Sequence, residues 1–80
     1  MPGVPRPPDP PWIIEERRRL GVRVREARER ANLTQEALEE QAGVKRLTLQ
    51  RIESGATDAR ISWLIRIARA IDIPVTDLLR

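Results

Sequence analysis

Two arginines, a leucine and a threonine lie close together between residues 45 and 54, and their side chains suit contacts with the edges of DNA bases. The guanidinium groups of Arg46 and Arg51 match the O6 and N7 acceptors of guanine, because both partners present two parallel hydrogen-bonding positions. Leu47 or Thr48 can pack against the methyl group of thymine. We therefore treat these four residues as candidate base contacts in the major groove.

The same segment offers side chains suited to the DNA backbone. Lys45 and Gln50 are candidate phosphate or secondary contacts, which position a protein on DNA without specifying a base sequence. Between Lys45 and Ile52 there are three basic residues and no acidic one. The alternative interpretation is an ordinary solvated helix face.

The residues needed for most catalytic and metal-binding chemistry are missing. The 80-residue chain contains no cysteine, no histidine and no tyrosine. It therefore lacks disulfides, the commonest metal ligand and the commonest general base. Its carboxylates lie mostly among arginines, and no glycine-rich phosphate loop is present. We expect a non-enzymatic protein with no cofactor and no metal site.

The charge balance is mildly basic. Fifteen Lys and Arg residues oppose twelve Asp and Glu residues, which gives a net charge of +3, and all but one of the basic residues are arginine. Arginine suits bidentate contacts to phosphate and guanine, although a GC-rich genome also favours arginine codons. No apolar run approaches the roughly 18 residues that span a membrane, and no signal peptide is recognisable. We expect a cytoplasmic protein located at the nucleoid, with no membrane partner.

Proline content divides the chain into two parts. Residues 1–11 hold all but one of the seven prolines, which predicts a disordered or extended arm. Arg6 could reach a DNA groove from such an arm, and a solvated tail is the alternative. From residue 12 to residue 80 the composition is that of a single small domain.

Apolar residues in the second part recur at helical spacing. The first predicted helix runs from about Pro11 to Ala31, with Gly21 weakening its middle. The second follows a Thr34 cap and ends at Gly43, and the third ends near Gly55. A fourth helix is capped by Thr57 or Asp58, and a short fifth begins at Pro74. In the fourth helix the predicted buried face is Ile61, Leu64, Ile65, Ala68 and Ile71, with Ile67 beside it.

Two short helices joined by a tight turn containing glycine are typical of a helix-turn-helix. The block from Leu33 to Gly55, with the later block from Leu64 to Leu79, resembles the Cro/lambda-repressor-like (Xre-type) helix-turn-helix family. The resemblance extends over about Leu20 to Leu79. It implies an all-α, five-helix, lambda-repressor-like DNA-binding domain with the helix-turn-helix at the second and third helices.

The resemblance also implies roles for particular residues. Thr34 and Gln35 correspond to positions that contact DNA phosphates. Arg28 and Glu53 correspond to a structural salt bridge that joins the first helix to the end of the third. The positions that read bases in the family match the candidates named above: Arg46, Leu47, Thr48 and Arg51.

Three residues depart from the family pattern. Glu39 stands where the family usually has alanine, and we expect it to swing outward or to pair with Arg46 or Arg51 at the expense of a base contact. Lys45 replaces the usual Ser or Thr cap, so the start of the third helix is expected to fray or to order only on DNA. Trp63 replaces a small polar residue and is expected to pack locally or to lie in a dimer contact.

The function that these observations favour is sequence-specific DNA binding by a transcriptional regulator, in particular a repressor. Its partner is double-stranded DNA, and a homodimer is expected, formed through the surface of helix 5 (Val75, Leu78, Leu79) or of Trp63. The alternative is a protein-interaction module, such as an antitoxin or a partner-binding regulator on the same fold. The acidic residues Glu36, Glu39 and Glu40 favour that alternative slightly.

Overall fold

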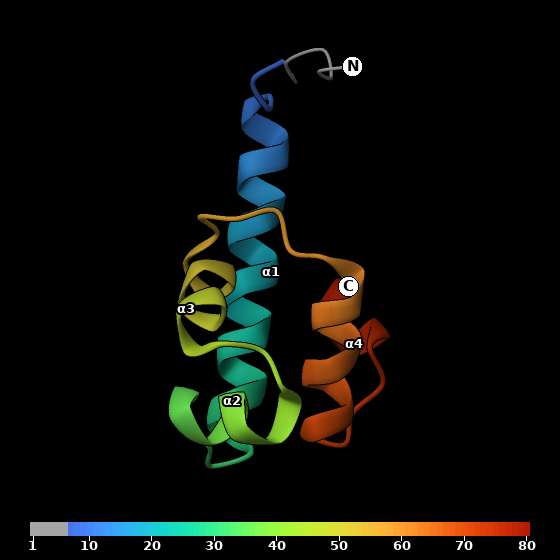
Figure 1. The fold of residues 1–80 in the computed structure, drawn as a ribbon. Coiled ribbons are helices and arrows are strands. Elements are labelled where there is room, and N and C mark those ends of the chain that lie inside the picture. Colours follow the sequence, from blue (N-terminus) through green and yellow to red (C-terminus); the bar gives the residue numbers. More distant parts are fainter. Residues whose placement is uncertain (1–6) are drawn as a thin grey trace.

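A computed structural model describes residues 7–80, which form five helices and no strand (Figure 1). The expected all-α, five-helix fold is confirmed. The helices are α1 (Pro11–Arg30), α2 (Gln35–Ala42), α3 (Arg46–Ser54), α4 (Ile61–Ala70) and α5 (Thr76–Leu79).

The long helix α1 runs through the whole molecule, and its first turns extend beyond the other helices (Figure 1). Gly21 lies where α1 meets α3. A Cβ atom at this position would stand 2.4 Å from the carbonyl oxygen of Glu53 and 2.5 Å from that of Ile52. The glycine therefore permits the close crossing of the two helices, and its cost to helix propensity is offset by this packing.

The helix ends agree with the residues that flank them. Thr34 caps α2, since its Oγ1 accepts a hydrogen bond of 3.0 Å from the amide of Ala37. Gly43 and Gly55 follow α2 and α3 with φ angles of 70° and 76°, which glycine adopts without a steric penalty. Asn32, two residues after the end of α1, has a φ angle of 58°.

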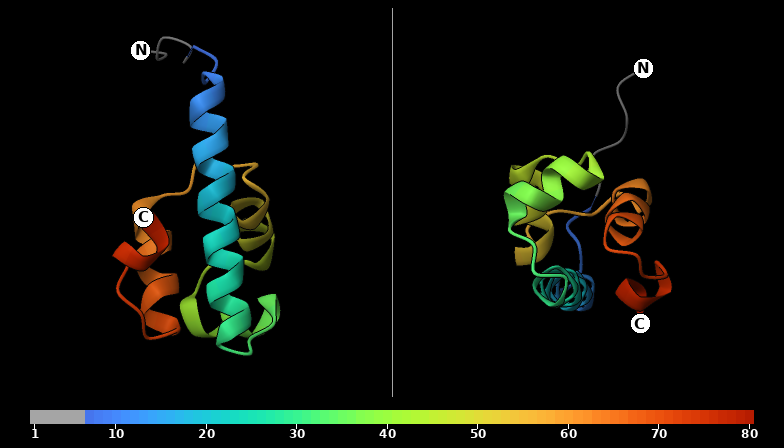
Figure 2. Two further views of the ribbon diagram at one scale, coloured as in Figure 1. Left: turned by 180° about the vertical axis from the view of Figure 1, so that it is seen from behind. Right: turned by 90° about the horizontal axis from the view of Figure 1, so that it is seen from below.

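The helices enclose one apolar core. In Figure 2, α2 and α3 lie on one side of the molecule and α4 and α5 on the other. Helix α1 contacts α3 and α5, while α2 contacts α3 and α4. The most deeply buried large side chains come from all five helices: Val24, Leu38, Leu49, Ile52, Ile67 and Leu78.

The predicted face of α4 is wrong in part. Ile67 is fully buried beside Leu64, whereas Ile61 and Ile65 are 58% and 49% exposed. Five isoleucines and leucines in eleven residues leave the helical period ambiguous, because an apolar residue stands on nearly every side. The N-cap residue of α4 is Arg60 rather than the predicted Thr57 or Asp58, and the Arg60 side chain makes no capping hydrogen bond.

The segment before α1 is anchored to the end of α3. Arg17 Nη1 lies 3.0 Å from Asp9 Oδ2, and Arg17 Nε donates a hydrogen bond of 3.1 Å to the carbonyl of Gly55. Pro11 is the first residue of α1 rather than part of an arm. The predicted arm otherwise falls mainly on residues 1–6, and these, with Arg6, lie outside the described residues.

Candidate DNA-binding surface

The outer face of α3 presents most of the predicted contact residues to solvent. Arg46, Gln50 and Arg51 are exposed, and Leu47 is 54% exposed, while Thr48 is half-buried. On the opposite face, Leu49 and Ile52 are 0% and 2% exposed. Because two buried residues fix the rotation of α3, the outer side chains project from a rigid element.

The start of α3 is held by a residue from α2. Glu39 Oε2 accepts a hydrogen bond of 2.7 Å from the backbone amide of Arg46. Lys45, at the N-cap position, supplies no side-chain hydrogen bond. The premise of the expected fraying, an uncapped start of α3, does not hold, because Glu39 serves as a cap from the neighbouring helix. The expected competition of Glu39 for the Arg46 guanidinium is also wrong, because Glu39 binds the backbone amide of Arg46 instead.

That guanidinium is engaged by a different carboxylate. Arg46 Nη1 donates a hydrogen bond of 2.9 Å to Glu36 Oε1. The two side chains are 52% and 64% exposed, so the pair lies in water at the edge of the α2–α3 turn. The hydrogen bond from Arg46 holds the pKa of Glu36 below its ordinary value.

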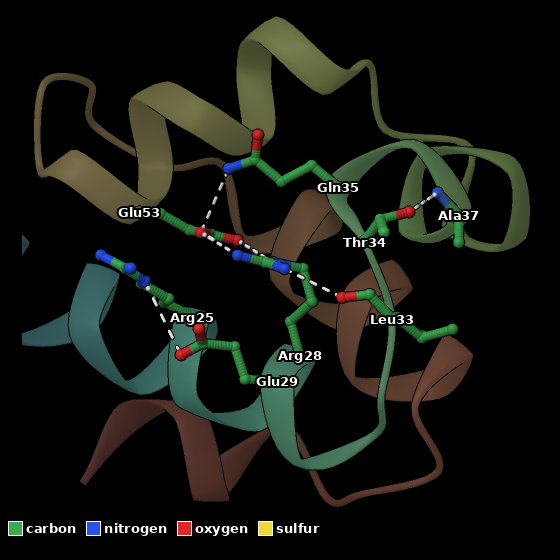
Figure 3. A network of polar contacts seen from close by, with 8 residues as sticks. All are labelled: Arg25, Arg28, Glu29, Leu33, Thr34, Gln35, Ala37 and Glu53. Atoms are coloured by element: carbon green, nitrogen blue, oxygen red, sulfur yellow. Dashed lines mark hydrogen bonds and ion pairs between the residues drawn. The ribbon is translucent and has the colours of Figure 1, made fainter.

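Behind α3, a half-buried network joins three helices (Figure 3). Arg28 Nε and Nη2 donate to the two carboxylate oxygens of Glu53 at 2.8 and 3.0 Å, and Arg28 Nη1 donates to the carbonyl of Leu33 at 2.9 Å. The side chains of Arg28 and Glu53 are only 12% and 6% exposed. Their hydrogen bond also raises the pKa of Arg28. The predicted pair is thus present with bidentate geometry, which is the strong form of this interaction.

The two predicted phosphate contacts at the start of α2 have partners within the chain. Gln35 Nε2 donates a hydrogen bond of 3.2 Å to Glu53 Oε1, which places this side chain against the network (Figure 3). Thr34 Oγ1 accepts from the amide of Ala37, and the Thr34 hydroxyl is also hydrogen-bonded to Glu36, which helps to lower the pKa of that carboxyl. Thr34 is exposed and Gln35 is half-buried.

Neither of the α2–α3 contacts at Arg46 was predicted in the form observed. The sequence shows a carboxylate at position 39 but not that it would reach the amide of Arg46. The pairing of Glu36 with Arg46, ten residues apart, depends on the angle between two helices and has no local signature. Both contacts follow from the tight turn at Gly43, which brings the outer edge of α2 beside the first turn of α3.

Within residues 7–80, no group of three carboxylates or other ligating side chains is placed to hold a metal ion. In that same range, none of the helices is both long enough and apolar enough to cross a membrane.

A tight turn between two short helices, with an outward face that carries arginines, defines the helix-turn-helix class of DNA-binding domain. The family model for the helix-turn-helix domain matches residues 19–80, and the chain belongs to this family. The resemblance to Cro/lambda-repressor-like, Xre-type proteins is confirmed, and the chain is a DNA-binding transcriptional regulator.

A solved structure supports the same assignment. The fold is similar to that of the restriction-modification controller protein C.AhdI from Aeromonas hydrophila, with a TM-score of 0.78 and 28% sequence identity. The match covers 80% of this chain and 97% of that protein. None of the curated proteins matches the chain by sequence.

Proposed function

We propose that this protein is a sequence-specific transcriptional repressor that reads the major groove with α3. The observation that carries the proposal is the outer face of α3, where Arg46, Leu47 and Arg51 project from a helix capped at its start and packed against the core. Arginine reads guanine with two hydrogen bonds, and an exposed leucine can contact a thymine methyl group. Repression follows where the bound protein overlaps a promoter.

The DNA backbone contacts in this proposal come from both ends of the helix-turn-helix. Thr34 and Gln35 face phosphates at the start of α2, where the helix dipole also favours an anion. Lys45 and Gln50 contact phosphates beside α3. The similarity to a restriction-modification controller protein supports regulation of gene expression rather than a purely structural role on DNA.

We propose that the protein binds its site as a homodimer. One domain of this size makes few contacts, and two-fold dimers place two reading helices on half-sites about 34 Å apart. The apolar residues exposed on α4, Ile61 and Ile65, supply a better interface than Trp63, which packs against the core with Arg60 above its ring. Leu79 of α5 is 49% exposed and remains available.

The alternative function, a protein-interaction module, loses part of its support. It was favoured by the acidic side chains of α2, yet Glu36 and Glu39 are both bound to Arg46 within the fold. A partner that is retained in a pull-down after nuclease treatment would restore this alternative.

The proposed function is tested by selecting bound sites from random double-stranded DNA with the wild type, Arg46→Ala and Arg51→Ala. Each variant should lose preference at defined base positions, at a cost of about 1–3 kcal/mol. Arg80→Ala is a control with the same charge change, since Arg80 follows α5 and, among residues 7–80, its ion pair is with Asp77. Selection of the same sites by all four proteins would contradict base reading by α3.

A salt titration tests the backbone contacts separately. The logarithm of the binding constant should fall linearly with the logarithm of salt concentration. Replacing Lys45 with alanine should weaken binding to all sequences alike and reduce the slope by about one unit. A slope that is flat in the wild type would contradict binding through phosphates.

A further inference from the structure

We infer that two copies of this protein pair through the outer face of α1, with the two helices antiparallel. This face consists of Trp12, Glu15, Arg19 and Val22. It is a different surface from the exposed residues of α4 in the homodimer proposed above. The inference does not depend on DNA binding, because none of the four residues is a proposed DNA contact.

The four side chains of this face lie on one side of α1 and are all exposed. Intervals of three and four residues place them in one row along the helix. The buried residues Gly21 and Val24 lie on the other side, toward the core. Trp12 is 67% exposed and Val22 is 51% exposed. In the left view of Figure 2, α1 lies in front of the other helices, so none of them covers this face.

The first turns of α1 are held in place although they extend beyond the other helices (Figure 1). Arg17 is bound both to Asp9 and to the carbonyl of Gly55. A Cβ atom at Gly55 would stand 3.0 Å from the Cα of Arg18, so the two backbones are in close contact. The family model begins only at residue 19. The surface that starts at Trp12 is therefore rigid, and half of it precedes the region that the family model matches.

The order of residue types on this face is symmetrical. An apolar, an acidic, a basic and an apolar residue follow one another at intervals of three, four and three residues. When two α1 helices run antiparallel and cross at position 17, Trp12 of each copy faces Val22 of the other. Glu15 of each copy likewise faces Arg19 of the other. Every contact then occurs twice, as a two-fold interface requires.

The charges on this face select one arrangement among those that two helices can adopt. A parallel pair would place Glu15 opposite Glu15 and Arg19 opposite Arg19. An antiparallel pair displaced by one helical turn would bring together either the two glutamates or the two arginines. Like charges placed opposite one another oppose association. The antiparallel pair centred at position 17 is the arrangement in which opposite charges meet.

The surface beside Val22 can receive the tryptophan of a second copy. An open hollow of about 320 Å³ is lined by Glu15, Arg18, Arg19, Val22 and Arg23. In the antiparallel pair, the indole ring of the second copy faces this hollow. A tryptophan supplies a large apolar area, and guanidinium groups pack favourably against its ring.

The local ion pair of Arg19 does not prevent the contact with a second copy. Arg19 Nη1 lies 3.3 Å from Glu16 Oε1, and both side chains are 60% exposed. A guanidinium group has five donors, so one exposed contact leaves others for Glu15 of the second copy. The paired segment is short, and small interfaces form weak complexes. We therefore expect weak association that depends on protein concentration.

The first experiment measures self-association of the full chain by analytical ultracentrifugation over a range of concentrations. Glu15→Arg and Arg19→Glu each place like charges opposite one another twice, and each should raise the dissociation constant at least about tenfold. The double variant restores opposite charges and should return to within about threefold of the wild type. Exchanging Arg25 and Glu29, an exposed pair beyond the paired segment, is the control and should change nothing.

The outcomes separate this surface from the one proposed on α4. Ile61→Ala truncates the α4 surface and should leave the effect of the charge reversals unchanged. Wild-type association that neither reversal weakens would overturn the α1 pair and leave α4 as the interface. A double variant as weak as the single variants would also overturn it, as would a wild type that stays monomeric at every concentration.

Cross-linking tests the register directly, because the chain has no cysteine of its own. A mixture of Glu15→Cys and Arg19→Cys keeps one Arg19–Glu15 contact and brings the two thiols together. A short thiol cross-linker should join this mixture faster than it joins Glu15→Cys alone. Replacing Arg19→Cys with Glu29→Cys moves one thiol beyond the paired segment and is the control. Equal rates for all three samples would reject the antiparallel pair centred at position 17.

Discussion

Two ion pairs in this molecule share the same chemistry and differ in their surroundings. Arg28 and Glu53 approach to 2.8 Å, and Arg46 and Glu36 approach to 2.9 Å. The first pair is 12% and 6% exposed and is bidentate, whereas the second is 52% and 64% exposed and uses one nitrogen. Distance alone would rank them as equals. Because the Arg28–Glu53 pair is buried, it holds α1 and α3 together. The Arg46–Glu36 pair is exposed, so the Arg46 side chain can exchange this partner for another.

The two pairs also lie at opposite ends of the same helix. Glu53 faces α1 and ties the end of α3 to Arg28 and Gln35 (Figure 3). Arg46 is at the start of α3 and turns toward α2. The buried pair therefore holds the end of the helix in place, and the exposed side chain of Arg46 belongs to the surface that we propose meets DNA. Substitutions at each pair should affect different properties.

The largest expected effect is loss of stability in Glu53→Ala. Removing this carboxylate leaves the half-buried guanidinium of Arg28 without its partner, which should cost about 3–5 kcal/mol. Glu36→Ala should cost far less, because its pair is exposed to solvent. Thermal unfolding of the two variants measures the difference. Similar melting temperatures would contradict the contrast between the pairs.

A second effect concerns the contact between α1 and α3 beside the buried pair. Gly21→Ala should destabilise the protein by about 1–3 kcal/mol, because the added methyl group would overlap two backbone carbonyl oxygens of α3. Urea unfolding checks the value. Val22→Ala, at a position that is 51% exposed on the same helix, is the control and should cost far less. A stabilised Gly21→Ala would show that α1 and α3 can separate freely.

The third effect tests the cap that Glu39 provides. Glu39→Ala should cost about 0.5–2 kcal/mol, the range for loss of a side-chain cap, and should increase hydrogen exchange in the first turn of α3. Glu40→Ala removes the same charge from α2 without removing a cap. Equal exchange rates at the start of α3 in both variants would mean that the hydrogen bond from Arg46 contributes nothing.

The sequence predicted the helices, the turn and the Arg28–Glu53 partnership, because each has a local signature or a family position. Thr34 and the two glycines that end α2 and α3 stand where capping chemistry requires them. The outward placement of Arg46, Leu47 and Arg51 followed from the helical spacing of Leu49 and Ile52. Capping preferences and helical spacing were sufficient for features that are determined within a single helix.

The predictions failed where the relative placement of two helices decided the outcome. Whether Glu39 reaches the guanidinium or the amide of Arg46 depends on a few ångströms at the α2–α3 turn. The face of α4 was assigned wrongly at Ile61 and Ile65, because their exposure depends on which side of that helix α2 covers. A sequence pattern reports periodicity, but the direction of packing is a property of the assembled core.

The smallest effect is electrostatic and concerns only the exposed pair. The hydrogen bond from Arg46 lowers the pKa of Glu36, so Arg46→Ala should raise that pKa toward its ordinary value. Carboxyl NMR titration measures both proteins. Since the folded-state pKa is depressed, the contribution of the pair to stability is present at neutral pH and is lost as the pH falls through that pKa. Saturating operator DNA should also raise the pKa in the wild type if Arg46 leaves Glu36 for guanine. An unchanged pKa of Glu36 in Arg46→Ala would mean that the Glu36–Arg46 pair does not persist in solution. Glu36 and Arg46 would then be two independent charges, and Arg28–Glu53 would have no exposed pair to be compared with.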